Sequence, residues 1–244
     1  MAHTIILILV ISFIASLVRS TFGFGESLVA VPLFLLFLPV AIAVPLSVML
    51  SVVIALIVVV QDHRKIHLSS AKWLILYALP GIPLGILILT YGNELLIKTG
   101  LGLLIIGYSV YSLVGKTSQT FKEDHKPWLF ICGFLSGVLG GAYGLNGPPL
   151  VVYGRLRQWS AQHFRATLQA YFLPASLVGV AGYYVKGLIT TDVGKYFLVS
   201  LATAVPAVFL GRYLNHRLKE GVFFRYIYCG LILIGTVLIV TATT

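Results

Sequence analysis

The sequence predicts an all-α polytopic membrane protein built from two inverted-topology repeats. Of its 244 residues, 59% are hydrophobic and only 10% are charged, so it lacks the polar surface that a soluble fold presents to water. Apolar runs recur from Thr4 almost to Thr244, and no long polar stretch remains for a separate soluble domain. Glycine and proline interrupt these runs at corresponding places in the two halves of the chain.

Ten apolar stretches follow one another along the chain. They cover residues 4–19, 27–38, 41–60, 73–91, 95–114, 128–141, 148–154, 167–185, 193–211 and 222–243. A helix needs about 20 apolar residues to cross a bilayer, so six of the stretches are predicted to be full spans. The four stretches beside FGFGES (22–27) and YGLNGPP (143–149) are shorter, and we expect half-helices there, in re-entrant hairpins or broken helices.

Each repeat is therefore predicted to hold one broken or re-entrant hairpin and three transmembrane helices. The first repeat covers 1–115, a linker covers 116–127 and the second repeat covers 128–244, all within one integral membrane domain. If each hairpin enters and leaves on one face, the three spans that follow reverse the orientation of the second repeat.

The distribution of Lys and Arg predicts the orientation in the membrane. Alternating the loops places 14 of the 17 basic residues on one face and only Lys98, Lys186 and Lys195 on the other. The 14 are Arg19, Arg64, Lys65, Lys72, Lys116, Lys122, Lys126, Arg155, Arg157, Arg165, Arg212, Arg217, Lys219 and Arg225. The positive-inside rule makes their face cytoplasmic. We expect a multi-pass protein of the cell membrane (inner or plasma), with both termini outside and the linker inside.

A weak internal repeat supports this organisation. A shift of 121 residues places Phe22 on Tyr143 and Gly23 on Gly144. Further along, PGIPLG (80–85) falls on PAVFLG (206–211) with a slightly larger shift. Two halves of opposite orientation, each interrupted at the same place, are typical of secondary transporters.

The interruptions predict where a solute binds. Backbone polar groups are tolerated unpaired at membrane depth only where protein or a water-filled cavity satisfies them. Helix N-termini near Ser27 and Pro148 would direct free N–H groups and a partial positive charge toward the membrane midplane, which suits an anion. Pro148 fits the first turn of a helix, where its missing N–H costs nothing.

At these residues the chain resembles the TauE/SafE family of sulfite and organosulfonate exporters, also described as sulfonate permeases. The family pattern is a glycine-rich break followed by proline, once in each half. The second half carries it as GFLSGVLGGAYGLNGPPLVVY (133–153), followed by RATLQAY (165–171), and the first half carries it as STFGFGESLVAVP (20–32). The resemblance covers nearly the whole chain. It implies movement of a small sulfur-containing or carboxylate anion, passive or ion-coupled, without ATP.

Ten residues are candidates for binding the substrate. They are Gly23, Gly25, Ser27, Gly144, Asn146, Gly147, Pro148, Thr21, Arg165 and Gln169. Asn146 offers both a donor and an acceptor. Arg165 and Gln169 share one helix face at i and i+4, although Arg165 also suits a cytoplasmic anchor. Thr21, Ser27 and Ser47 offer hydroxyls, which in membranes commonly bond their own helix carbonyls.

Glu26 departs from what an anion site favours, because it places a carboxylate in the first break. An intramembrane carboxylate is usually functional or paired. Two roles stay open at this point: Glu26 is a proton-coupling group, or it forms a structural pair with Arg19.

Other classes of function lack their essential groups. The chain has no HExxH, no GxSxG and no glycine loop followed by a Walker lysine, so we expect no enzyme and no cofactor. His63 and His67 have helical spacing but lie in a polar loop, and no metal is expected. The charge of +10 carries no aromatic–basic pattern for nucleic acid. The expected partners are the lipid bilayer, a small anion and a proton if transport is coupled, and we also consider a homodimer. An anion channel with the same breaks, or a carrier of a small carboxylate, remains an alternative.

Overall fold

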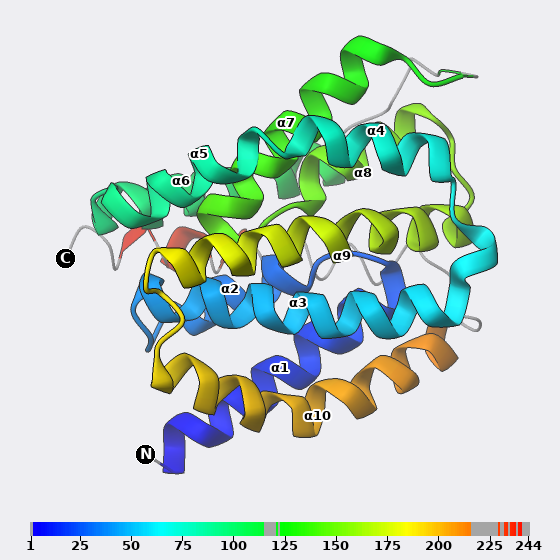
Figure 1. Cartoon of the computed structure of the whole chain (residues 1–244). Coiled ribbons are helices and arrows are strands. Elements are labelled where there is room, and N and C mark those ends of the chain that lie inside the picture. Colours follow the sequence, from blue (N-terminus) through cyan, green and yellow to red (C-terminus); the bar gives the residue numbers. More distant parts are fainter. Residues whose placement is uncertain are drawn as a thin grey trace.

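The computed structural model describes residues 2–114, 121, 123–215, 229, 232–233, 235–237 and 239–240 (Figure 1). Half of the predicted linker and most of the tenth apolar stretch lie outside these residues. So do five of the basic residues that predicted the orientation, which are Lys116, Lys122, Arg217, Lys219 and Arg225.

The part of the chain that the structure describes is helical and contains no strand. The helices are α1 (Ala2–Phe22), α2 (Glu26–Phe34), α3 (Val40–Asp62), α4 (Leu68–Ala78), α5 (Gly81–Tyr91), α6 (Glu94–Val114), α7 (Lys126–Tyr143), α8 (Gly147–Leu156), α9 (Ala161–Val185) and α10 (Thr191–Asn215), with a short 3₁₀ turn η1 (His63–Lys65) after α3. Five of these segments, in α1, α3, α6, α9 and α10, are long and apolar enough to cross a membrane. The prediction of an all-α polytopic membrane protein is confirmed.

Two predicted elements differ from the structure. The stretch 4–19 was expected to be a half-helix, but α1 has 21 residues and His3–Phe22 is long enough for a full span. Residues such as Ser20 and Thr21 extend the helix beyond the apolar run. The stretch 73–91 was expected to be one straight span, but α4 and α5 meet at a bend of 44°. Pro80 lies at the bend, where a proline lacks the N–H that would continue the helix.

The offset of 121 residues also relates the helix boundaries. The last residues of α1 and α7 are Phe22 and Tyr143, and the first residues of α2 and α8 are Glu26 and Gly147. The first residues of α3 and α9, Val40 and Ala161, differ by the same offset. The short helices α2 and α8, of 9 and 10 residues, follow breaks of equal length at residues 23–25 and 144–146.

The two sequence halves exchange helices. In the lower part of Figure 1, α10 of the second half packs along α1 of the first half, and α3 packs beside α10 and α2. In the upper part, α4 and α5 of the first half pack along α7 of the second half. We call α1, α2, α3 and α10 the lower group, and α4, α5, α7, α8 and α9 the upper group. The main contact between the groups is α3 against α9.

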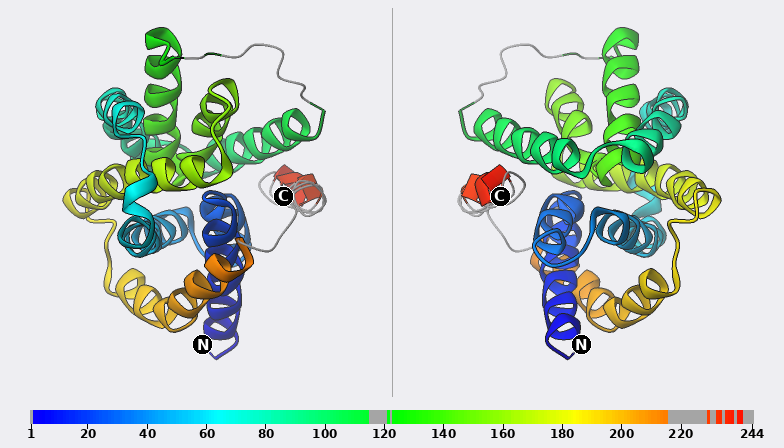
Figure 2. Two further views of the ribbon diagram at one scale, coloured as in Figure 1. Left: turned by 90° about the vertical axis from the view of Figure 1, so that its right-hand side faces the viewer. Right: turned by 90° about the vertical axis from the view of Figure 1, so that its left-hand side faces the viewer.

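Figure 2 shows how the broken helices approach the middle of the molecule. α1 rises from below and α7 descends from above, so the ends of both helices come close to the middle. Glycines allow the close contact of α4 and α5 with α7. A Cβ on Gly81 of α5 would lie 2.9 Å from the Val138 backbone nitrogen, and one on Gly133 of α7 would lie 2.9 Å from the carbonyl oxygen of Leu74 on α4.

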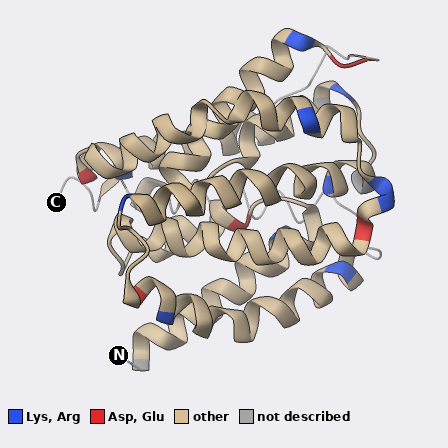
Figure 3. Cartoon of the chain, viewed as in Figure 1, with Lys and Arg blue, Asp and Glu red and all other residues tan. Residues whose placement is uncertain are grey.

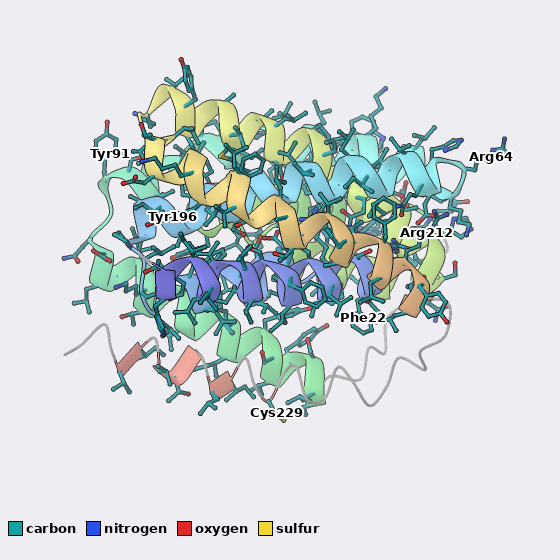
Figure 4. The ribbon with its side chains drawn as sticks, turned by 90° about the horizontal axis from the view of Figure 1, so that it is seen from below. Phe22, Arg64, Tyr91, Tyr196, Arg212 and Cys229 are labelled. Atoms are coloured by element: carbon teal, nitrogen blue, oxygen red, sulfur yellow. The ribbon has the colours of Figure 1, made fainter. Side chains whose placement is uncertain are left out.

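The surface matches a lipid environment. Large apolar side chains are exposed along the helices, as at Val60 (67% exposed) and Leu198 (68%). Described charged residues gather mainly at the two ends of the helices (Figure 3). Figure 4 places Arg64 and Arg212 at one end, which we call the basic end, and Tyr91 and Tyr196 at the other.

Candidate functional site

Each break is formed by a glycine that ends a helix in the left-handed conformation. Gly23 follows α1 with φ 86°, and its N–H donates to the Arg19 carbonyl at 2.7 Å. Gly144 follows α7 with φ 70°, and its N–H donates to the Gly140 carbonyl at 2.9 Å. Glycine adopts this conformation without the steric cost of a Cβ, so the chain can leave α1 and α7 abruptly and start α2 and α8 three residues later.

The two breaks line one cavity. It has about 290 Å³ of empty space, and its walls come from both halves of the sequence. The lining residues are Arg19, Gly25, Glu26, Ser27, Leu28, Ser51, Gly144, Leu145, Asn146, Gly147 and Phe172. The N-terminal ends of α2 and α8 both border this space, so two positive ends of helix dipoles meet there.

Arg19 and Glu26 form an ion pair in the cavity wall, with 3.1 Å between Nη1 and Oε2. Arg19 Nη1 also donates to the Ser51 hydroxyl, and its Nε and Nη2 donate to Gln169 Oε1 at 3.1 and 3.0 Å. The guanidinium carbon lies 4.6 Å from the centre of the Phe172 ring. These contacts hold the guanidinium on four sides, which fixes its position beside the carboxylate.

The Glu26 carboxylate has hydroxyl donors besides Arg19. Ser47 donates to Oε1 at 2.7 Å and Ser27 donates to Oε2 at 3.0 Å. Ser47 also lies 3.0 Å from the Ser27 hydroxyl. Together with Arg19, these donors balance the charge of a carboxylate that is only 1% exposed, as a buried ion requires.

The second break is fixed through its backbone and leaves the Asn146 side chain facing the cavity. Ser136 donates to the Asn146 carbonyl at 2.6 Å, and Tyr171 donates to Ser136 at 2.8 Å. The side chain of Asn146 packs against Gly140, where any Cβ would collide with its amide. No hydrogen bond of the Asn146 side-chain amide is found within the described residues.

The remaining candidates lie around the cavity or behind it. Gly25, Ser27, Gly144, Asn146 and Gly147 line it, together with Arg19 and Glu26. Pro148 is the second residue of α8, in its first turn as expected. Thr21 Oγ1 donates to the Leu17 carbonyl of its own helix at 2.7 Å. This is the bond that an intramembrane hydroxyl commonly makes when it does not bind a ligand.

Gly23, Arg165 and Gln169 form the layer directly behind the first break. Gln169 Nε2 donates to the Gly23 carbonyl at 2.6 Å. A Cβ on Gly23 would lie 2.8 Å from Arg165 Cα, so α9 passes very close to the break. Arg165 itself pairs with Asp62 at 3.3 Å.

The sequence analysis missed two lining residues that approach Arg19. Ser51 stands four residues after Ser47 on α3, and two serines one helical turn apart in an apolar run are a signal for a polar stripe. Phe172 lies in an apolar stretch and gives no comparable signal, because its role depends on α9 packing against α1 and α3.

The described residues hold no group of three or more His, Cys, Asp or Glu side chains arranged for a metal. Asp124 and Arg157 form a second polar cluster outside the predicted spans, with 3.1 Å between Arg157 Nε and Asp124 Oδ1. Ser70 and Tyr153 donate to the same carboxylate at 2.7 and 2.8 Å. Because these donors come from α4 and α8, the cluster joins the segment just before α7 to two neighbouring helices.

Two broken helices around one cavity in a helical polytopic membrane protein are typical of membrane transporters. The family model "Sulfite exporter TauE/SafE" matches residues 8–238, which is nearly the whole chain. The chain therefore belongs to the TauE/SafE sulfite exporter family, whose members are membrane exporters of sulfite and related sulfur anions and not enzymes. Comparisons with curated proteins and with solved structures find no match.

Proposed function

We propose that this protein is a secondary transporter that carries sulfite, an organosulfonate or a related sulfur oxyanion by alternating access. We place the substrate in the cavity between the two breaks, near the membrane midplane. One observation carries this proposal: the N-terminal ends of α2 and α8 and the side chain of Asn146 border the same space.

Backbone amides supply the donors for an anion. Val29 is the residue whose N–H reaches the Gly25 carbonyl, at 3.2 Å, so the amides of residues 26–28 precede the first intrahelical bond of α2. The N-cap residue of α2 is Gly25, which has no side chain to cap these amides. At α8, Pro148 and Pro149 have no N–H, and the Asn146 amide takes the place of these missing donors.

The charge and size of the cavity favour a small anion. The Arg19–Glu26 pair neutralises the carboxylate, so the two helix dipoles and the amide donors leave a net attraction for negative charge. The empty space of about 290 Å³ includes a part that is open to solvent, so the enclosed part is smaller and suits a compact oxyanion better than a large organic molecule.

The exchange of helices indicates which parts would move. Because α10 packs on α1 and α5 packs on α7, the sequence halves do not form separate bodies. The lower group contributes Arg19, Glu26 and Ser51 to the cavity, and the upper group contributes Asn146 and Phe172. We therefore propose that the two groups rock against each other along the α3–α9 contact, with the anion between them.

The role of Glu26 in coupling stays a separate hypothesis. Its ion pair with Arg19 supports a structural role, and its position in the cavity wall leaves room for a proton-coupling role as well. Glu26→Gln removes the titratable group and keeps the side-chain volume. If transport by this variant keeps the pH dependence of the unmodified protein, Glu26 is not the coupling group.

Transport by purified protein in liposomes tests the proposal. With ³⁵S-sulfite as the probe, we expect saturable uptake and accumulation driven by unlabelled sulfite on the opposite side. Asn146→Ala should reduce uptake strongly, whereas Asn93→Ala, in the exposed turn before α6, serves as the matched control. Unitary currents without counterflow would indicate an anion channel instead. Counterflow with acetate but not with sulfite or taurine would indicate a carboxylate carrier.

A further inference from the structure

Arg165 is a buried cation with spare hydrogen-bond donors. The residue is 2% exposed, and its Nη1 atom lies 3.3 Å from Asp62 Oδ2. Its Nε and Nη2 atoms have no hydrogen-bond partner within the described residues. Buried donors of a charged group are costly to leave unpaired, so this guanidinium can bind an acceptor that the described residues do not supply.

Arg165 lies directly behind the cavity. Gly23, at the first break, packs on the Arg165 backbone, and Phe24 meets the neighbouring Phe164 with 5.9 Å between ring centres. Gln169 follows Arg165 by four residues on α9 and contacts Arg19 of the cavity wall. Arg19, Gln169 and Arg165 thus lie in a row of polar side chains that leads away from the substrate space.

This row leads toward the basic end. Asp62 is the last residue of α3, and η1 with Arg64 follows it directly. Asp62 also pairs with Arg212, at 3.8 Å, and Arg212 is 41% exposed in contrast to the buried Arg165. Figure 4 shows Arg64 and Arg212 together at this end.

The two pairs made by Asp62 differ in what they join. Asp62 belongs to the lower group and Arg165 to the upper group, so their ion pair crosses the boundary along which we propose movement. Arg212 lies on α10, in the same group as Asp62. Only the pair with Arg165 must separate if the groups part at this end.

We propose that Arg165 is a second, transient binding residue for the transported oxyanion, and that an anion bound at its free donors weakens the ion pair with Asp62. This inference rests on the proposed function. A guanidinium binds an oxyanion through two parallel N–H···O bonds, and Nε and Nη2 provide such a pair of donors. The bound anion shares the positive charge of Arg165 and repels the Asp62 carboxylate at Nη1, so the contact between the groups weakens and the arrival of the substrate itself opens the basic end.

Equilibrium exchange of ³⁵S-sulfite across liposomes tests this inference without a need to know the orientation of the protein. Asp62→Asn removes the competitor of the anion, so the half-saturating sulfite concentration should fall about threefold. Arg165→Gln removes the ligand, so that concentration should rise about fivefold or more. Asp62→Asn/Arg165→Gln should resemble Arg165→Gln, and it also removes the unpaired carboxylate that could disturb folding of the single variant. Arg212→Gln is the matched control and should stay within about twofold.

The opposite signs of the two single substitutions carry the test. If Asp62 and Arg165 form only a structural ion pair, both substitutions change the half-saturating sulfite concentration in the same direction, and the inference is overturned. An unchanged half-saturating concentration in Asp62→Asn and in the double variant overturns it as well. A failure of the unmodified protein to exchange any sulfite would refute the proposed function instead.

Discussion

Arg19 and Glu26 pair in the wall of the cavity with side chains that are only 4% and 1% exposed. A buried pair of this kind is strongly destabilised when one partner is removed, because the other charge stays buried without compensation. We expect Glu26→Gln to lower the free energy of unfolding by about 3 kcal/mol. Thermal or denaturant unfolding in detergent measures this change.

Glu94→Gln is the control for that substitution. Glu94 pairs with Lys98 at 3.0 Å, but its side chain is 57% exposed, and such surface pairs contribute little. Arg19→Met combined with Glu26→Gln should cost less than the sum of the two single substitutions. Strict additivity, or an equal effect of Glu26→Gln and Glu94→Gln, would show that the buried pair is not coupled.

Asn146 should determine anion affinity with little effect on folding. Its side-chain amide borders the cavity, and a hydrogen bond to a charged group contributes about 1.5–3 kcal/mol. Asn146→Ala should therefore weaken sulfite binding about tenfold to a hundredfold. The shift of the melting temperature with sulfite concentration reports this affinity. A variant that is stabilised by sulfite as well as the unmodified protein would remove Asn146 from the site.

Gly23 should tolerate no side chain. Its φ of 86° is unfavourable for other residues, and a Cβ would lie 2.8 Å from Arg165 Cα, which is backbone and has little freedom to move. Gly23→Ala should lower stability by about 2 kcal/mol or more. Gly107→Ala is the matched control, because nothing lies within 4 Å of a Cβ there and alanine favours the helix. Equal melting temperatures of the two variants would contradict this account of the break.

Asp124 should make the stability of the folded protein fall as the pH becomes acidic. Burial by itself raises the pKa of Asp124, but hydrogen bonds from Ser70 and Tyr153 and the charge of Arg157 lower it below the usual 3.8. Since the folded-state pKa lies below the unfolded value, the contribution is complete above about pH 5 and is lost as the pH falls through the folded value. The melting temperature of Asp124→Asn should lie below that of the unmodified protein at pH 7, and the two should converge toward pH 3. A constant difference across this range would show that the ionised carboxylate is not the stabilising form.

The sequence predicted the breaks well because they follow from local chemistry. Glycine that ends a helix and proline that begins one are visible in FGFGES and YGLNGPP, and the helix ends at Phe22 and Tyr143 match the alignment. The bend at Pro80 was missed although its proline is equally visible, because apolar composition continues across it. Hydropathy measures lipid solubility and does not report the course of the backbone.

The partners of the site residues were harder to predict. The pairing of Arg19 with Glu26 is local and was one of two anticipated roles. The contacts of Arg19 with Gln169, and of Arg165 with Asp62, join residues that are far apart in the chain. They depend on the packing of α9 on α3, and a pattern in a single sequence does not specify which helix faces meet.

The exchange of helices between the halves has a consequence for biosynthesis. The ribosome releases α1 long before its main neighbour α10, and it releases α5 before α7. During translation, α1 and α5 therefore contact lipid or a chaperone in the bilayer until α10 and α7 have been synthesised. Assembly of the substrate cavity is completed only near the end of synthesis, and a chain that stops after the first half would lack the main partner of each helix.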